Sequence, residues 1–196
     1  MTHGYEFTTA ITNIFIAGLA LYFFLSIRKD KKIDYKWKLF FFLLFVAGVM
    51  GIIIHGIVML PIIKKILWII LSFIFGVIIN LLFIISLSKK YSKLGLKEVF
   101  LLTIGIYIIL LIEILKDINF VPTYTIYALI CGIIITILNI KNKYYVIGLL
   151  FQYIGGAIIL LKKYINVPVL NHNGIYHLCM CVTIIFFYLN LKEKRN

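Results

Sequence analysis

The chain has 196 residues, of which 63% are hydrophobic and only 14% are charged, and its formal net charge is +13. This composition excludes a soluble domain of this length, so the chain is predicted to be an integral membrane protein. No nucleic-acid partner is expected, because the positions of the basic residues between apolar runs account for the positive charge.

Seven apolar runs follow one another along the chain, each close to the ~20 residues that cross a bilayer as a helix. Only short loops remain between them, which leaves no room for a soluble domain. The sequence therefore predicts a single all-α domain over residues 1–196, a bundle of seven transmembrane helices. The expected spans are residues 6–27, 38–60, 65–88, 97–115, 120–140, 144–161 and 173–191.

The basic residues are distributed unequally between alternate loops. Of the 20 lysines and arginines, 15 fall in the first, third and fifth loops and at the C-terminus, and 5 fall on the other side. Basic residues of short loops stay in the cytoplasm. We therefore expect a multi-pass protein of the plasma membrane with its N-terminus outside and its C-terminus in the cytoplasm. Membrane lipids are its expected partners. The basic first loop is interpreted as a topology signal, with contact to anionic lipids as the alternative.

A polar stripe opens the first span. Glu6, Thr9 and Asn13 lie at positions i, i+3 and i+7, which places them on one face of a helix. A stripe at this depth is expected to face the bundle, with His3 as one candidate partner for the carboxylate. The alternative interpretation is that these residues only cap the helix and form interhelical hydrogen bonds.

Two histidines flank the start of the last span, in the segment Asn171-His172-Asn173-Gly174-Ile175-Tyr176-His177. With Asn173 as the helix cap, His177 lies one turn inside the helix. His172 then lies just outside the helix, where it is free to turn inward. Two imidazoles in this arrangement are suited to holding a metal or sharing a proton.

The second span carries small residues in its outer half, Gly48, Gly51 and Gly56, together with His55. Small residues allow a neighbouring helix to approach closely. His55 is therefore expected about one turn from the outer end of its helix, facing protein and not lipid.

Alternation of the seven spans places all four histidines near the outer face. Zinc commonly takes three protein ligands and leaves a fourth position for a water molecule that it acidifies. Glu6 would then be the base or a partner of a ligand. Glu113 and Asp117 are expected either as carboxylates that support the histidines or as an ordinary charge cluster beside the membrane. The competing interpretation of the histidines is a metal-free set of hydrogen-bonding or pH-responsive residues.

Other polar and aromatic residues have simpler interpretations. Gln152 is expected to form an interhelical hydrogen bond, and a continuous polar path through Gln152, Asn80 and Asn139 would indicate a carrier. The aromatic residues near span ends fit the interfacial belt of membrane proteins. They are Trp37, Trp68, Tyr144 and Tyr145.

Three motifs carry a resemblance to known families: Glu6-x-Thr8-Thr9-x-x-Thr12-Asn13, His55-Gly56 and Asn171-His172-Asn173-x-x-x-His177. Together they resemble an uncharacterised family of small bacterial seven-span membrane proteins. More distantly, the layout resembles the alkaline ceramidases and the progestin and adiponectin-type receptors. That resemblance implies a seven-helix fold, zinc held by histidines of an early helix and the last helix, and hydrolysis of lipid amides.

The leading expectation is therefore a zinc-dependent hydrolase of a lipid or lipid-like amide or ester, with its site near the outer leaflet. The metal ligands would be His55, His172 and His177, and Glu6 would handle the proton. His3, Thr9, Asn13, Asn171 and Asn173 would line the pocket around them. The alternative is a non-enzymatic membrane sensor or a carrier of protons or small solutes.

Overall fold

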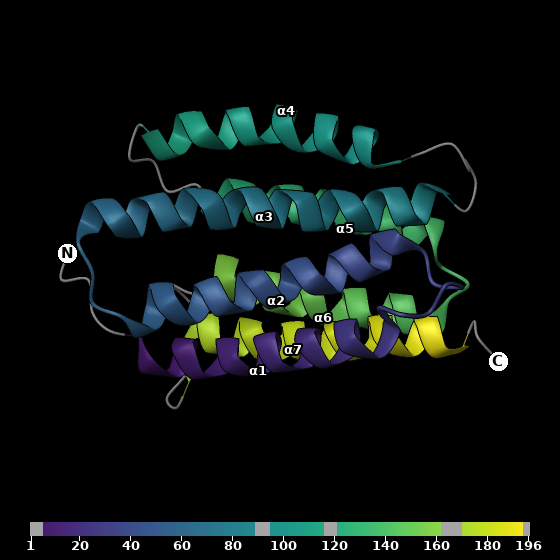
Figure 1. Cartoon of the computed structure of the whole chain (residues 1–196). Helices are drawn as coiled ribbons and strands as arrows, with labels where there is room; N and C mark the ends of the chain where they lie inside the picture. The colour runs from purple at the N-terminus through teal and green to yellow at the C-terminus, as the bar shows by residue number, and fades with distance from the viewer. Residues whose placement is uncertain (1–5, 89–94, 116–120, 162–169, 194–196) are drawn as a thin grey trace.

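The computed structural model describes residues 6–88, 95–115, 121–161 and 170–193. In these ranges the chain forms seven helices and no strand. Consecutive helices run in opposite directions, and α4 lies at one edge of the bundle, against α3 (Figure 1). The helices are α1 (Phe7–Ile27), α2 (Tyr35–Gly56), α3 (Pro61–Ser88), α4 (Leu96–Leu115), α5 (Val121–Leu138), α6 (Lys143–Leu160) and α7 (His172–Glu193).

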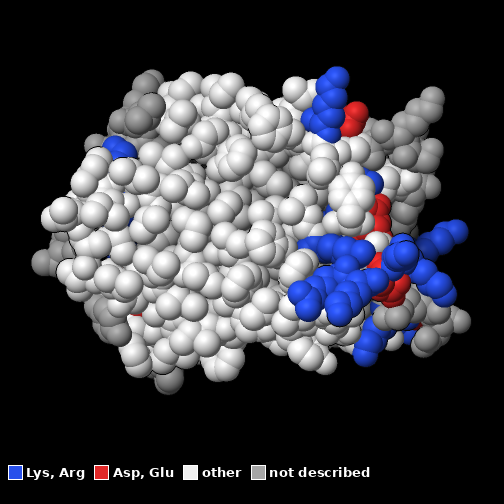
Figure 2. Space-filling view, viewed as in Figure 1, with Lys and Arg blue, Asp and Glu red and all other residues white. Residues whose placement is uncertain are grey.

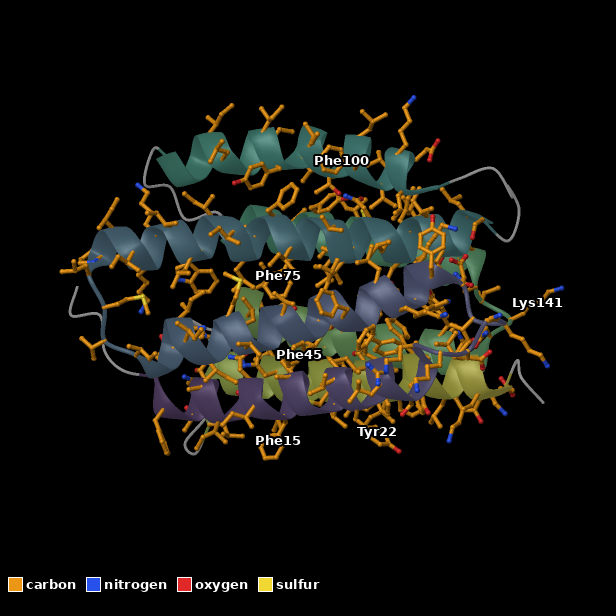
Figure 3. The ribbon with its side chains drawn as sticks, in the orientation of Figure 1. Phe15, Tyr22, Phe45, Phe75, Phe100 and Lys141 are labelled. Atoms are coloured by element: carbon orange, nitrogen blue, oxygen red, sulfur yellow. The ribbon has the colours of Figure 1, made fainter. Side chains whose placement is uncertain are left out.

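Among the described residues, five helices are long and apolar enough to cross a membrane, namely α1, α2, α3, α6 and α7. The protein is thus an all-α, multi-pass membrane protein. Large apolar side chains cover its sides, as a bundle surrounded by lipid requires. On α1, Phe15 and Tyr22 are 56% and 63% exposed and point away from the bundle, whereas Phe75 lies between α3 and α2 (Figure 3).

Helix α2 starts and ends earlier than the apolar run at 38–60 predicts. Asp34 begins it, because its carboxylate accepts a hydrogen bond from the backbone N–H of Lys36 at 2.9 Å. The helix ends at Gly56, where Ile57 turns to extended backbone, and the next helix opens with Pro61. Proline suits a first helical turn but disfavours helix in the residue before it. As a result His55 lies at the very end of its helix, and not a full turn inside it.

The two ends of the bundle differ in charge. The histidine end contains the start of α1, the end of α2 and the start of α7. The opposite end, here called the basic end, gathers most of the described lysines and arginines, as Figure 2 shows. The basic end includes Arg28, Lys29, Lys31, Lys32, Lys36, Lys38, Lys97, Lys141, Lys143 and Lys192.

Aromatic side chains fill the interior at the basic end. Tyr145 and Phe41 are fully buried, and Phe187 is 1% exposed. Trp37 packs edge-on against Tyr145 and Phe187, with ring centroids 6.0 and 6.1 Å apart. The interfacial prediction was therefore wrong for Trp37 and Tyr145, because the rotation of their helices turns both rings into the core. We call this cluster of Trp37, Phe40, Phe41, Tyr145 and Phe187 the aromatic floor.

Helices α1 and α2 approach closely through glycine, as the sequence predicts. A Cβ atom on Gly48 would lie 2.8 Å from the backbone nitrogen of Ala17. A Cβ atom on Gly51 would overlap the side-chain amide of Asn13. This contact brings the polar stripe of α1 against α2. The side chain of His55, near the end of α2, is packed against α1 and is only 9% exposed.

Candidate functional site

The beginning of α1 is joined to the end of α2 by Glu6 and His55. The backbone N–H of Glu6 donates to the carbonyl oxygen of His55 at 3.2 Å. Glu6 Oε2 also lies 3.1 Å from His55 Nδ1, and the two groups form an ion pair when the imidazole is protonated. The contact with His55 lowers the pKa of Glu6 to about 2, against the opposing effect of partial burial. Glu6 is therefore a carboxylate at neutral pH.

Two polar residues hold the Glu6 carboxylate in place. The Thr9 hydroxyl lies 3.1 Å from Glu6 Oε2 and donates to it, and the amide of Asn173 donates to the same oxygen at 3.3 Å. The amide of Asn171 in turn donates to the Thr9 hydroxyl at 2.7 Å. Helix α7 is thus tied to α1 through asparagine side chains at the histidine end.

The cap of α7 is Asn171, and the prediction of Asn173 as the cap was wrong. Asn171 Oδ1 accepts a hydrogen bond from the backbone N–H of Gly174 at 2.7 Å, and the helix begins at His172. Asn173 is consequently inside the first turn, with its side chain free to reach Glu6. His172 and His177 are five residues apart on one helix, about 140° around its axis, so they face different directions. His177 lines the cavity described below, and His172 is not among its lining residues.

Thr12 fixes the orientation of His177. The Thr12 hydroxyl lies 2.9 Å from His177 Nδ1 and 3.0 Å from the carbonyl oxygen of Thr9. Because a hydroxyl group both donates and accepts, either Thr12 or Nδ1 of His177 is the donor of this bond, according to the tautomer of the imidazole. The rings of His55 and His177 are near one another, with centroids 6.3 Å apart.

A cavity of about 380 Å³ lies inside the bundle between α1, α2, α3, α5, α6 and α7. Its size falls within the range of about 300–1,000 Å³ that is typical of ligand pockets. At the histidine end it is lined by Glu6, Asn13, His55, Lys64, Asn173 and His177. Toward the basic end its wall is largely apolar and reaches Phe40 and Phe187 of the aromatic floor. The cavity therefore combines a polar end with a long apolar interior.

The structure brings together part of the predicted site. Glu6, Thr9, Asn13, His55, Asn171, Asn173 and His177 all lie at the histidine end, joined by the contacts above. His3 and Asp117 lie outside the described residues, and the side chain of Glu113 is likewise not described. Of the α4 residues whose side chains the structure describes, none lines the cavity.

Within the described ranges, no three histidine, cysteine, aspartate or glutamate side chains lie close enough to share a metal ion. His55 and His177 face one cavity, but the third predicted ligand, His172, does not join them. The described residues therefore do not form the predicted three-histidine zinc site. Zinc binding stays a prediction, and no chemical step is derived from it here.

Two residues of the site were missed from the sequence. Thr12 holds His177, and its position three residues after Thr9 would have placed it on the polar stripe. Tyr176 accepts a hydrogen bond from Gln152 at 2.9 Å, which confirms the interhelical bond predicted for Gln152. Of Gln152, Asn80 and Asn139, only Gln152 lines the cavity. Asn80 instead bonds to Thr103 and Tyr127, on the side of α3 that faces α4 and α5.

Comparison with known proteins gives a family and no individual relative. No curated protein and no solved structure matches the chain. Nothing in these comparisons links it to the ceramidases or to the progestin and adiponectin-type receptors, although an all-helical fold is compatible with them. Residues 8–196 match the family model described as a family of unknown function, DUF6962. Since this match covers nearly the whole chain, the protein belongs to that family.

Proposed function

We propose that all seven helices cross the plasma membrane, with the histidine end outside and the basic end in the cytoplasm. The alternating directions of the helices support this topology (Figure 1). The gathering of basic side chains at one end supports the orientation, because lysine and arginine in short loops remain cytoplasmic.

Within this topology, we propose that the protein binds a lipid-like amphiphile in its internal cavity. The observation that carries the proposal is the cavity itself, with Glu6, His55, Asn173 and His177 at one end and an apolar wall beyond them. A hydrocarbon chain would pack against the apolar part of the cavity wall. A head group with hydroxyl or amide N–H groups would meet the Glu6 carboxylate and the imidazole of His177. Ligand sites with mostly apolar walls and a few placed polar groups have this character.

The test measures binding of monopalmitoylglycerol to the purified protein in detergent, with native mass spectrometry as the detection method. Wild type is expected to form a one-to-one complex. Ala128→Phe adds a ring to the cavity wall and is expected to weaken binding by about tenfold or more, a free-energy change of about 1.4 kcal/mol. Ile130→Phe is the matched control, since Ile130 is on the same helix but 54% exposed on its outer side.

Equal binding by Ala128→Phe, Ile130→Phe and wild type would mean that the lipid sits on the outside of the bundle. No complex with wild type would refute the proposal directly. A melting temperature of Ala128→Phe close to that of Ile130→Phe serves as the check that the added ring did not unfold the protein.

A second candidate, hydrolysis of a lipid-like amide or ester, is favoured by one feature of the site. An ionised carboxylate, Glu6, lies beside one imidazole, and the Nε2 of a second imidazole, His177, is oriented by Thr12. Such groups are suited to moving a proton to or from a water molecule. Turnover of monopalmitoylglycerol or a palmitoyl amide by wild type, abolished by Glu6→Gln, would establish it. Absence of turnover, with binding retained, would leave the protein as a binding protein.

A further inference from the structure

The amide of Gln152 is incompletely bonded inside the cavity. Its Nε2 donates to the hydroxyl oxygen of Tyr176 at 2.9 Å. Its Oε1 is buried and accepts no hydrogen bond from any described residue. Both Gln152 and Tyr176 line the cavity. Because an unpaired buried acceptor is costly, this oxygen indicates a partner that enters the cavity.

Tyr176 supplies the complementary group. Its hydroxyl oxygen accepts from Gln152, and no described residue accepts its hydroxyl hydrogen. The pair thus offers one free acceptor, Gln152 Oε1, and one free donor, the Tyr176 O–H. A single hydroxyl group is both donor and acceptor, so it would satisfy the two at once.

The pair lies deeper in the bundle than the Glu6–His55 contact. Gln152 is in the middle of α6, on the basic-end side of Gly155. A Cβ atom on Gly155 would meet Tyr176 and Cys179, which places Gly155 opposite the first turns of α7. Beyond Gln152 toward the aromatic floor, the cavity is lined by apolar residues such as Ile184 and Phe187, with Thr183 bonded to Gly148. A ligand whose head group is at Glu6 would therefore pass Gln152 with its chain.

We propose that Gln152 and Tyr176 form a second polar contact within the cavity, and that the ligand is a long-chain amphiphile with a hydroxyl group on its chain. This inference rests on the proposed binding of a lipid-like molecule, and it names the chemical class of that molecule. A plain hydrocarbon chain would cover Gln152 Oε1 and the Tyr176 O–H without bonding either. Sites built to bond a hydroxyl group reject the analogue that lacks it for this reason.

The test compares monopalmitoylglycerol with a series of analogues that carry one hydroxyl group at successive carbons of the palmitoyl chain. Native mass spectrometry gives the dissociation constant of each from purified wild type. The best hydroxylated analogue is expected to bind about ten- to a hundredfold more tightly than the plain chain, the fold-change that corresponds to leaving one buried group unpaired. The preference should be confined to one or two positions on the chain, because Gln152 is at a fixed depth.

Two variants test whether Gln152 and Tyr176 cause the preference for a hydroxylated chain. Gln152→Leu removes the amide at similar volume and is expected to bind the plain chain at least as well as wild type, with a smaller preference, because the Tyr176 hydroxyl group remains. The double variant Gln152→Leu/Tyr176→Phe removes both polar groups, and its preference should fall to about twofold or less. If variants with leucine at this position fail to fold, Gln152→Met/Tyr176→Phe decides the question.

Equal affinity of wild type for plain and hydroxylated chains would overturn this inference and leave the proposed lipid binding intact. A preference that persists when both the amide of Gln152 and the hydroxyl group of Tyr176 are removed would also overturn it. If neither class of probe binds wild type, the proposed function fails, and the inference that rests on it fails as well.

Discussion

The close approach of α1 and α2 makes a specific prediction about Gly48. Replacement by alanine would place a methyl group 2.8 Å from the backbone nitrogen of Ala17 and 3.0 Å from its Cα. Both atoms belong to the backbone of α1, so neither can rotate away as the end of a side chain could. The two helices would have to separate, and the bonds that connect Glu6 and Thr9 to α2 and α7 would be strained.

Two opposing effects set the change in the free energy of unfolding that Gly48→Ala causes. Added atoms in a well-packed interior typically cost about 1–3 kcal/mol. Alanine favours helix over glycine by up to about 1 kcal/mol. Gly18→Ala gains the helix propensity of alanine without any packing cost, because no atom lies within 4 Å of a Cβ atom on Gly18. The difference between the two variants therefore isolates the packing term, and Gly48→Ala is expected to be less stable than Gly18→Ala by about 1–3 kcal/mol.

The assay is reversible unfolding in mixed micelles, with a denaturing detergent as the perturbant and helical circular dichroism as the signal. Wild type, Gly48→Ala and Gly18→Ala are measured under identical conditions. A difference between the two variants of less than about 0.5 kcal/mol, the usual range for substitutions away from packed sites, would refute the close packing of these helices.

Four further outcomes are expected. A cysteine added at the C-terminus should not react with an impermeant thiol reagent applied to intact cells, and labelling from outside would reverse the proposed topology. The stability that Glu6 contributes should be complete above its unfolded pKa of 4.5 and be lost as pH falls toward about 2, so Glu6→Gln should flatten pH-dependent unfolding in that window. Thr12→Val should destabilise the protein by about 1–3 kcal/mol, because it leaves Nδ1 of His177 without its partner, whereas Thr12→Ser should restore most of the loss. Elemental analysis of purified wild type beside His177→Ala tests the zinc prediction, which requires about one zinc per chain in wild type alone.

The helices could be predicted well because membrane thickness fixes both their length and their apolar character. The first helix was expected over 6–27 and lies at Phe7–Ile27. The end of α2 was misplaced because Ile57 to Leu60 are as apolar as the helix before them, and hydropathy does not distinguish helical from extended backbone. The local effect of Pro61 decided that boundary.

The candidate site was predictable where a helical period controls it. Glu6, Thr9 and Asn13 share a face by spacing alone, and the structure buries Thr9 and Asn13 almost completely. The cap of α7 was not decided by spacing, since Asn171 and Asn173 are both competent caps only two residues apart. The direction of His172 depended on that choice. The cavity was beyond sequence reasoning, because its shape arises from the rotation and tilt of six helices together.

The aromatic floor has a mechanical consequence. Any solute that crossed the membrane through the cavity would have to part Tyr145, Phe41 and Phe187, three rings that are at most 1% exposed. Close-packed interiors have discrete arrangements and do not widen gradually, so passage would require a second complete packing of α2, α6 and α7. In this conformation the cavity is closed toward the basic end by the aromatic floor. A molecule that entered the cavity at the histidine end would have to leave at that same end, or laterally between two helices.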